Sequence, residues 1–269
     1  MEKSVKISLI QTDLAWEQTD KNLQNFDRLI EKVPSDSEIV ILPEMFSTGF
    51  TMNVEKIEKP VGKKAFEWMK NKAKQIDKIL VGSILFEQNA KFYNRMFWMP
   101  PDGNFQSYDK RHLFQMGGEH HIMTAGNKRT IVEFKGIKFL LQICYDLRFP
   151  VWSKNSFDKN SQTYEYDVII YIANWPESRK YAYENLLKAR AIENQSAVIW
   201  VNRTGKDGND IYHSGDTCFV DETGKVRTKT EAGQEQILTF YLNKEQILNT
   251  RNSFKVGLDW DNFKIFVKV

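Results

Sequence analysis

The sequence has few cysteines, no long apolar stretch and no signal-peptide pattern, and each of these absences excludes a class of protein. Two of its 269 residues are cysteines, which is too few for a disulfide scaffold. No apolar stretch approaches the roughly 20 residues that a membrane-spanning helix needs. The N-terminus lacks the basic head, apolar middle and small-residue cleavage site of a signal peptide. Together these absences predict a cytoplasmic protein with reduced thiols and no membrane contact.

Neither positive nor negative charge is in large excess. The formal net charge is +3 and is spread along the chain, and basic clusters such as Lys63-Lys64 are too short to indicate nucleic acid. Neither GxGxxG nor GxxxxGK[ST] occurs, so no nucleotide cofactor is expected. The adjacent pair His120 and His121 points in two directions and has no Cys/His/Asp cluster beside it, so no metal is expected either.

What is present is an alternation of strand-like and helix-like segments in a chain of ordinary globular composition, 41% hydrophobic and 27% charged. Helical spacing of apolar residues predicts helices over 19–33, 62–76, 183–194 and 244–250. Apolar runs predict strands over 5–11, 38–42, 79–86, 92–98, 130–134, 138–143, 167–173, 197–202, 216–220, 225–230 and 236–242. The continuous runs indicate sheets covered on both faces. No linker-like segment interrupts them, so we expect one α/β domain over 1–269, with an aromatic tail at 252–269 that packs on a neighbour such as a partner subunit.

Several of these strands end in a polar group. Glu44 follows the strand at 38–42, Cys144 follows 138–143, and Asn174 follows 167–173. Open α/β folds place reactive groups at the carboxyl ends of strands. Cys144 is therefore a candidate nucleophile, with a small core residue as the alternative, and Glu44 is either its base or a capping group.

A cation would complete such a site. Lys110 is either a solvated charge or a group that stabilises an oxyanion and lowers the pKa of the thiol. Glu119 could hold that lysine by a charge-assisted hydrogen bond, although its spacing alone is more typical of a surface charge. A Cys/His dyad with His112, His120, His121 or His213 is a further alternative, but none of these lies in a recognisable protease signature.

Taken together, these segments resemble the nitrilase superfamily of carbon–nitrogen hydrolases. Ile41-Leu42-Pro43-Glu44 is similar to its glutamate motif, 108–114 (Tyr-Asp-Lys-Arg-His-Leu-Phe) to its lysine motif, 144–150 (Cys-Tyr-Asp-Leu-Arg-Phe-Pro) to its nucleophile motif, and 188–194 to its helix signature. The resemblance runs from about residue 5 to about 248. It implies a four-layer αββα sandwich and a homodimer.

Finer features resemble the omega-amidase branch, among them Cys-Tyr-Asp-Leu-Arg-Phe-Pro-Val-Trp from Cys144 and Ala-Asn-Trp-Pro from Ala173. The resemblance implies that Glu44 acts as base for Cys144, that Lys110 and the backbone N–H of Tyr145 hold the oxyanion, and that Glu119 assists Lys110. It implies hydrolysis of the terminal amide of 2-oxoglutaramate or 2-oxosuccinamate through a thioester, without metal or organic cofactor.

Such a substrate carries a carboxylate, so its pocket needs a cation. Arg148 is our candidate, with an ion pair to Asp146 as the alternative. The candidate pocket walls, which core packing explains equally well, are Phe50, Phe114, Tyr145, Asn174 and Trp175. The alternative functions are an N-carbamoyl amino acid amidohydrolase or a nitrilase with the same catalytic residues, and a catalytically silent binding subunit. The expected partner is a small amide, not nucleic acid or a membrane.

Overall fold

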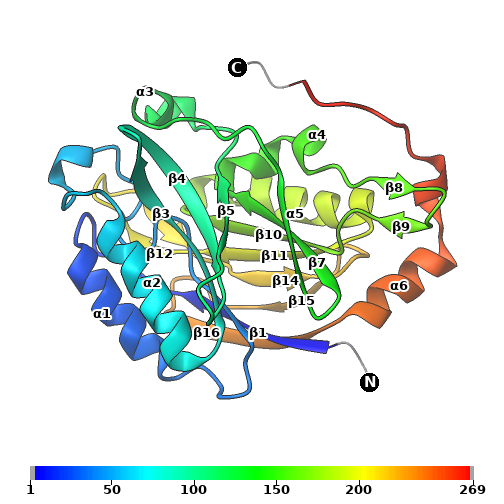
Figure 1. Cartoon of the computed structure of the whole chain (residues 1–269), viewed down its shortest axis with the longest axis horizontal. Coiled ribbons are helices and arrows are strands. Elements are labelled where there is room, and N and C mark those ends of the chain that lie inside the picture. Colours follow the sequence, from blue (N-terminus) through cyan, green and yellow to red (C-terminus); the bar gives the residue numbers. More distant parts are fainter. Residues whose placement is uncertain (1–3, 267–269) are drawn as a thin grey trace.

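Two six-stranded sheets form the centre of the molecule, which we describe from a computed structural model covering residues 4–266 (Figure 1). The first sheet has the order β16 (Gln236–Asn243), β1 (Ser4–Gln11), β2 (Ile39–Ile41), β3 (Ile79–Gln88), β4 (Lys91–Met99) and β5 (Gln106–Asp109). The second has the order β15 (Val226–Lys229), β14 (Cys218–Val220), β11 (Ala197–Asn202), β10 (Val168–Ala173), β7 (Ile137–Ile143) and β6 (Thr130–Phe134). The strands β1, β2 and β3 are parallel to one another, as are β7, β10 and β11.

Period-two alternation decides which layer each side chain joins. On β2, Ile39 and Ile41 enter the core between the two sheets, whereas Val40 enters the core beneath the helices. Helices α1 (Thr19–Ile30) and α2 (Lys63–Ile76) cover the outer face of the first sheet, and α5 (Lys180–Asn194) packs on the second. The result is the αββα sandwich that the family resemblance predicted.

The remaining elements are short. They are the helices α3 (Glu119–Ile122), α4 (Pro150–Ser153) and α6 (Lys244–Ser253), the 3₁₀ turns η1 (Val54–Lys56), η2 (Gln115–Gly117), η3 (Cys144–Arg148), η4 (Glu177–Arg179) and η5 (Val256–Asp259), and the strand pairs β8 (Phe157–Asp158) with β9 (Thr163–Tyr164) and β12 (Thr204–Lys206) with β13 (Tyr212–Ser214). The sequence did not predict those four strands, since each has only two or three residues. The helix predicted over 19–33 ends earlier, at Ile30, and the one predicted from 183 begins at Lys180.

Of the aromatic tail, Trp260 packs on its own chain. The ring of Trp260 lies 5.5 Å from that of Tyr164, and Lys154 Nζ lies 3.6 Å from the centre of the Trp260 ring. Phe263 and Phe266 are exposed, and residues 267–269 lie outside the described part. In Figure 1 this segment is the red trace that runs along the edge of the molecule from beside β8 and β9.

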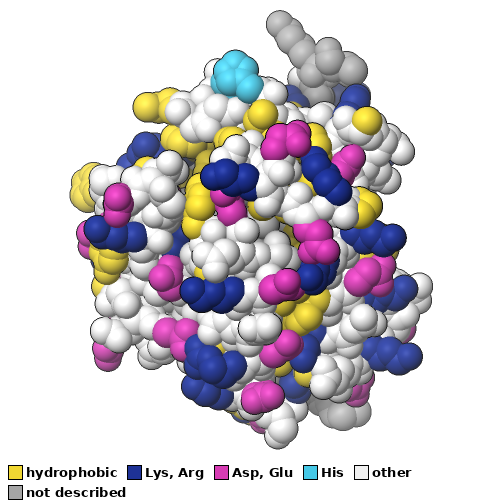
Figure 2. All heavy atoms as spheres, turned by 90° about the vertical axis from the view of Figure 1, so that its left-hand side faces the viewer, with side chains coloured by type: hydrophobic (Ala, Val, Ile, Leu, Met, Phe, Trp, Pro, Cys, Tyr) yellow, Lys and Arg dark blue, Asp and Glu magenta, His cyan; other side chains and the backbone are white. Residues whose placement is uncertain are grey.

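The outer surface carries charges of both signs. On the face drawn in Figure 2, Lys and Arg side chains are intermixed with Asp and Glu. Within residues 4–266, none of the helices combines the length and apolar content that crossing a bilayer requires.

Candidate active site

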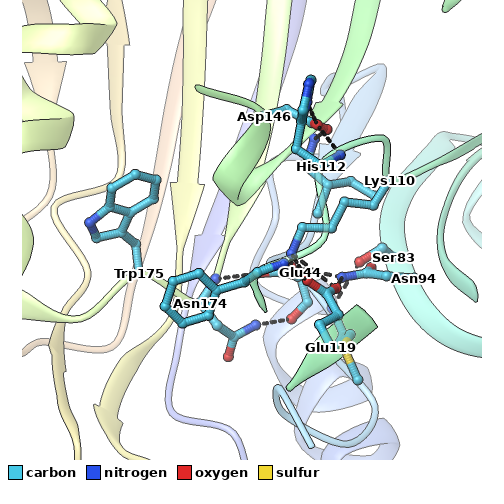
Figure 3. A network of polar contacts seen from close by, with 12 residues as sticks. Glu44, Ser83, Asn94, Lys110, His112, Glu119, Asp146, Asn174 and Trp175 are labelled. Carbon is cyan, nitrogen blue, oxygen red and sulfur yellow. Dashed lines mark hydrogen bonds and ion pairs between the residues drawn. The ribbon is translucent and has the colours of Figure 1, made fainter. Parts of the chain in front are cut away.

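Glu44 lies just beyond β2 and is fully buried. Its Oε1 accepts hydrogen bonds from Asn94 Nδ2 at 2.7 Å and from Lys110 Nζ at 2.9 Å, and its Oε2 accepts one from the backbone N–H of Asn174 at 2.7 Å. The Nδ2 of Asn174 also donates to the Glu44 backbone carbonyl. Donors from three elements therefore fix the carboxylate in one orientation (Figure 3).

The ammonium of Lys110 lies between two carboxylates. Lys110 follows β5 and is 1% exposed, and its Nζ is 2.9 Å from Glu44 Oε1 and 3.0 Å from Glu119 Oε2. Burial by itself lowers the pKa of Lys110, but the charges of Glu119 and Glu44 outweigh it and the pKa is raised above its ordinary value. Lys110 is therefore a cation at neutral pH.

Glu119 stands at the start of α3, where the structure buries it completely. Its Oε2 accepts the backbone N–H of Phe114 at 2.6 Å, and its Oε1 lies 3.1 Å from Lys110 Nζ. Burial raises the pKa of Glu119, Lys110 lowers it and Glu44 raises it, with a net rise. The surface position that its spacing favoured is wrong, and the contact with Lys110 is present.

Cys144 directly follows β7 and opens η3 with a left-handed backbone, at φ +43°. This conformation costs a non-glycine residue energy and is common at functional sites. Burial raises the pKa of the Cys144 thiol, the charge of Glu44 raises it further, and Lys110 lowers it, with a net rise. The expectation that Lys110 lowers the pKa of this thiol is confirmed, but burial and Glu44 outweigh it, so the net pKa is raised. The thiol is protonated at neutral pH and needs a base, and Glu44, whose charge acts on it, is the carboxylate that could serve.

Asp146 joins the segment that carries Lys110 to the segment that carries Cys144. Its Oδ1 accepts from the backbone N–H of His112 at 2.9 Å and lies 2.8 Å from His112 Nδ1, and its Oδ2 accepts from Tyr108 O–H at 2.7 Å. Oδ2 also accepts the backbone N–H of the residue before the cysteine, at 3.1 Å. Tyr108 and His112 flank Lys110 in the sequence, so one buried carboxylate aligns the cation with the thiol.

We expect Asp146→Asn to weaken both stability and catalysis, because the amide presents donors where four donors already converge. Each hydrogen bond lost to the carboxylate costs about 1.5–3 kcal/mol in free energy of unfolding. A shift of the reacting groups by about 1 Å would lower kcat by about 100-fold. Urea unfolding and steady-state kinetics measure both effects.

The matched control is Asp158→Asn, an exposed aspartate on β8 whose acceptors serve its own loop. It should change the free energy of unfolding by less than about 0.5 kcal/mol. Equal effects from the two variants would contradict the role of Asp146.

A cavity of about 370 Å³ opens onto Cys144 and Lys110. All the residues proposed from the sequence as pocket walls line it, together with the proposed carboxylate-binding arginine: Phe50, Phe114, Tyr145, Arg148, Asn174 and Trp175. The sequence therefore identified one connected surface from segments separated by more than a hundred residues.

The contacts of Arg148 and Asn174 differ from those that the sequence suggested. The suggested ion pair between Arg148 and Asp146 is wrong, since Asp146 binds Tyr108 and His112, and the Arg148 guanidinium lies 4.9 Å from the centre of the Trp175 ring. Asn174 does more than line the cavity, because both of its nitrogens are bonded to Glu44. In Figure 3, Trp175 lies to one side of the polar network, whereas Asn174 belongs to it.

None of the four histidines is placed as a partner of the thiol in the hydrogen bonds of residues 4–266. His112 is bonded to Asp146, and the rings of His120 and His121 lie 3.8 Å apart, tilted by 40°. His213 lines the cavity, but burial lowers its pKa to about 4 and its Nδ1 lies 3.0 Å from the carbonyl of Ile211. Over the same residues, no group of three or more His, Cys, Asp or Glu is arranged to hold a metal ion.

The sequence reasoning missed Asn94, which bridges Glu44 and Glu119 from the middle of β4, and Arg179, which lines the cavity from η4. A polar residue inside an apolar strand was the available signal for Asn94. Arg179 lies six residues beyond the end of β10, which by itself does not distinguish it from a surface arginine.

Comparison with known proteins places this geometry in a family. The sequence profile named carbon-nitrogen hydrolase matches residues 6–252, almost the whole chain. The chain belongs to the carbon–nitrogen hydrolase family. The predicted resemblance to the nitrilase superfamily is thereby confirmed.

This carbon–nitrogen hydrolase is similar to named relatives over nearly its full length. It is 38% identical over 260 residues to a Yersinia enterocolitica protein named omega-amidase YafV, covering 97% of this chain and 98% of that one. It is 31% identical over 254 residues to a Bacillus subtilis protein named 2-oxoglutaramate amidase, covering 93% and 95%. The crystal structure of XC1258 from Xanthomonas campestris, described as a CN-hydrolase superfamily protein, superposes with a TM-score of 0.93 at 37% identity over 98% of this chain and 99% of that one.

Proposed function

We propose that the chain is an omega-amidase that converts 2-oxoglutaramate or 2-oxosuccinamate to the dicarboxylate and ammonia. The observation that carries the proposal is that Lys110 and Cys144 line one cavity whose wall holds Arg148, while buried Glu44 is bonded to Lys110 and its charge acts on Cys144. The relatives named omega-amidase and 2-oxoglutaramate amidase support the same substrate class.

Each step of the proposed reaction uses a group of this chain. Glu44 takes the thiol proton of Cys144, and the sulfur attacks the amide carbon. Lys110 Nζ and the backbone N–H of Tyr145 stabilise the oxyanion, and one such donor is typically worth about 10²–10³ in rate. Protonated Glu44 gives its proton to the leaving nitrogen, so the C–N bond breaks, ammonia leaves and a thioester remains.

Hydrolysis of the thioester uses Glu44 again, first as base and then as acid. Glu44 takes a proton from water, the hydroxide attacks the thioester carbon and the C–S bond breaks. Glu44 then returns the proton to Cys144 as the acid leaves. Glu119 keeps Lys110 in place throughout, since its carboxylate is paired with the ammonium as that of Glu44 is.

Ammonia release tests the proposal directly. We expect rapid release from 2-oxoglutaramate and much slower release from glutamine, whose chain differs only at the 2-position. N-carbamoyl amino acids and nitriles belong in the same panel, because the same catalytic residues could serve them. A preference for either of those classes would replace omega-amidase as the function.

We expect Arg148→Met to raise KM for 2-oxoglutaramate by about 10- to 100-fold, the cost of losing a hydrogen-bonded charge pair. KM for an uncharged amide such as pentanamide should change far less, because that substrate has no carboxylate for the guanidinium. Equal changes in KM for both substrates would remove Arg148 from carboxylate binding.

The homodimer stays a prediction of the family resemblance, and the cytoplasmic location stays a prediction of the sequence composition. Light scattering coupled to size exclusion, over a range of protein concentrations, tests the dimer.

A further inference from the structure

Two guanidinium groups line the cavity that contains Cys144. One is Arg148, in η3, and the other is Arg179, at the end of η4. Both residues are exposed to solvent, and within residues 4–266 no ion pair or side-chain hydrogen bond engages either guanidinium. Two uncompensated cations in one concave surface indicate an anionic ligand.

Each guanidinium lies over an aromatic ring. Arg148 Cζ lies 4.9 Å from the centre of the Trp175 ring, and Arg179 Cζ lies 5.0 Å from that of Phe114. Trp175 also connects the two, since its Nε1 donates to the Arg179 carbonyl at 3.2 Å. A guanidinium that contacts a ring retains its N–H groups for hydrogen bonds, and those groups match a carboxylate.

The rest of the lining does not neutralise this charge. Asp207 is the only acid among the described residues that line the cavity. Its Oδ1 already accepts the backbone N–H groups of Asn209 and Ile211, and within residues 4–266 it forms no ion pair with Arg148 or Arg179. His213, whose pKa burial lowers to about 4, is neutral at pH 7.

We propose that Arg179 is a second carboxylate-binding residue, and that with Arg148 it clamps the 1-carboxylate and 2-oxo oxygens of the substrate. The inference rests on the proposed omega-amidase function. It assigns to these two arginines the enzyme's selectivity between substrates that differ at the 2-position. A 2-oxo group offers a lone pair to the two guanidiniums. A 2-amino group would place an ammonium beside two like charges, so the clamp selects 2-oxo acids over the corresponding amino acids.

The test compares Arg179→Met, Arg179→Lys and Arg148→Met with the native enzyme on 2-oxoglutaramate, glutamine and pentanamide. We expect Arg179→Met to raise KM for 2-oxoglutaramate by about 10- to 100-fold, with a much smaller loss on pentanamide. The ratio of kcat/KM for 2-oxoglutaramate over glutamine should fall by a similar factor. Arg179→Lys should recover part of this ratio, because lysine restores the positive charge but not the planar, two-pronged hydrogen-bond donor of arginine.

The matched control is Lys91→Met, which removes one exposed positive charge at the start of β4. It should leave KM and kcat for all three substrates unchanged. This result would distinguish the loss of a local contact from a general loss of positive charge. Equal loss on 2-oxoglutaramate and pentanamide in Arg179→Met would show a structural role and overturn the proposal. No loss on either would show a solvated side chain and also overturn it.

A failure of the proposed function is distinguishable from a failure of the clamp. If the native enzyme does not hydrolyse 2-oxoglutaramate, the omega-amidase assignment falls, and the clamp is judged by succinamate against butanamide. A native preference for the carboxylate-bearing amide that Arg179→Met reduces would support the clamp. A native enzyme without that preference would overturn it.

Discussion

Cys144→Ala lowers amidase turnover by about 10⁴- to 10⁶-fold, the range seen when a nucleophile is removed from a hydrolase. The remaining groups cannot form the thioester, since Glu44 and Lys110 activate and stabilise but carry no sulfur. The fold should survive, because the side chain is small and sits at the cavity floor with 9% exposure. Ammonia release and a thermal melt measure the two outcomes.

Cys218→Ala is the matched control for that variant. Cys218 lies on β14 with 4% exposure, and burial raises the pKa of its thiol to about 12. It lines no part of the cavity that contains Cys144. We expect native kcat from Cys218→Ala. Near-native ammonia release from Cys144→Ala would make the nucleophile assignment wrong.

Glu44→Gln should lower kcat by about 10²- to 10⁴-fold, the usual contribution of a general acid–base group. The amide cannot take the proton of Cys144, whose raised pKa keeps it protonated at pH 7. The substitution also conflicts with its neighbours, because both carboxylate oxygens accept hydrogen bonds and the new NH₂ group must face a donor. Steady-state kinetics at fixed pH give the loss.

Glu119→Gln distinguishes the carboxylate that acts as the base, Glu44, from the one that holds Lys110, Glu119. Glu119 contacts Lys110 and the backbone of Phe114, so we expect a smaller fall in kcat than in Glu44→Gln. A larger loss from Glu119→Gln than from Glu44→Gln would reverse the two assignments.

The parts of the site that lie at strand ends were predictable from the sequence. Glu44, Cys144 and Asn174 each follow an apolar run, and parallel strands deliver their carboxyl ends to the same edge of a sheet. Because β2 and β10 belong to different sheets, the pattern alone did not require Glu44 and Asn174 to meet. The family motifs supplied that expectation, and the hydrogen bonds between the two residues are present.

Other parts depend on packing that local sequence does not encode. Glu119 stands in a four-residue helix with two exposed histidines after it, and only the buried ammonium of Lys110 explains its position. Asn94 belongs to β4, where the apolar pattern gave no role to one polar residue. The role of Arg179 rests on its contact with Phe114, a residue 65 positions away, which no periodicity reports.

The central claim is that an acyl group of the substrate passes through the sulfur of Cys144. Acid quenching of the enzyme during a single turnover of 2-oxoglutaramate, followed by mass analysis of its peptides, tests this claim most directly. We expect the peptide containing Cys144 to carry the substrate mass less ammonia, and to lose that mass as the dicarboxylate is released. An unmodified Cys144 throughout the turnover, or the same acyl mass on another residue, would contradict the account.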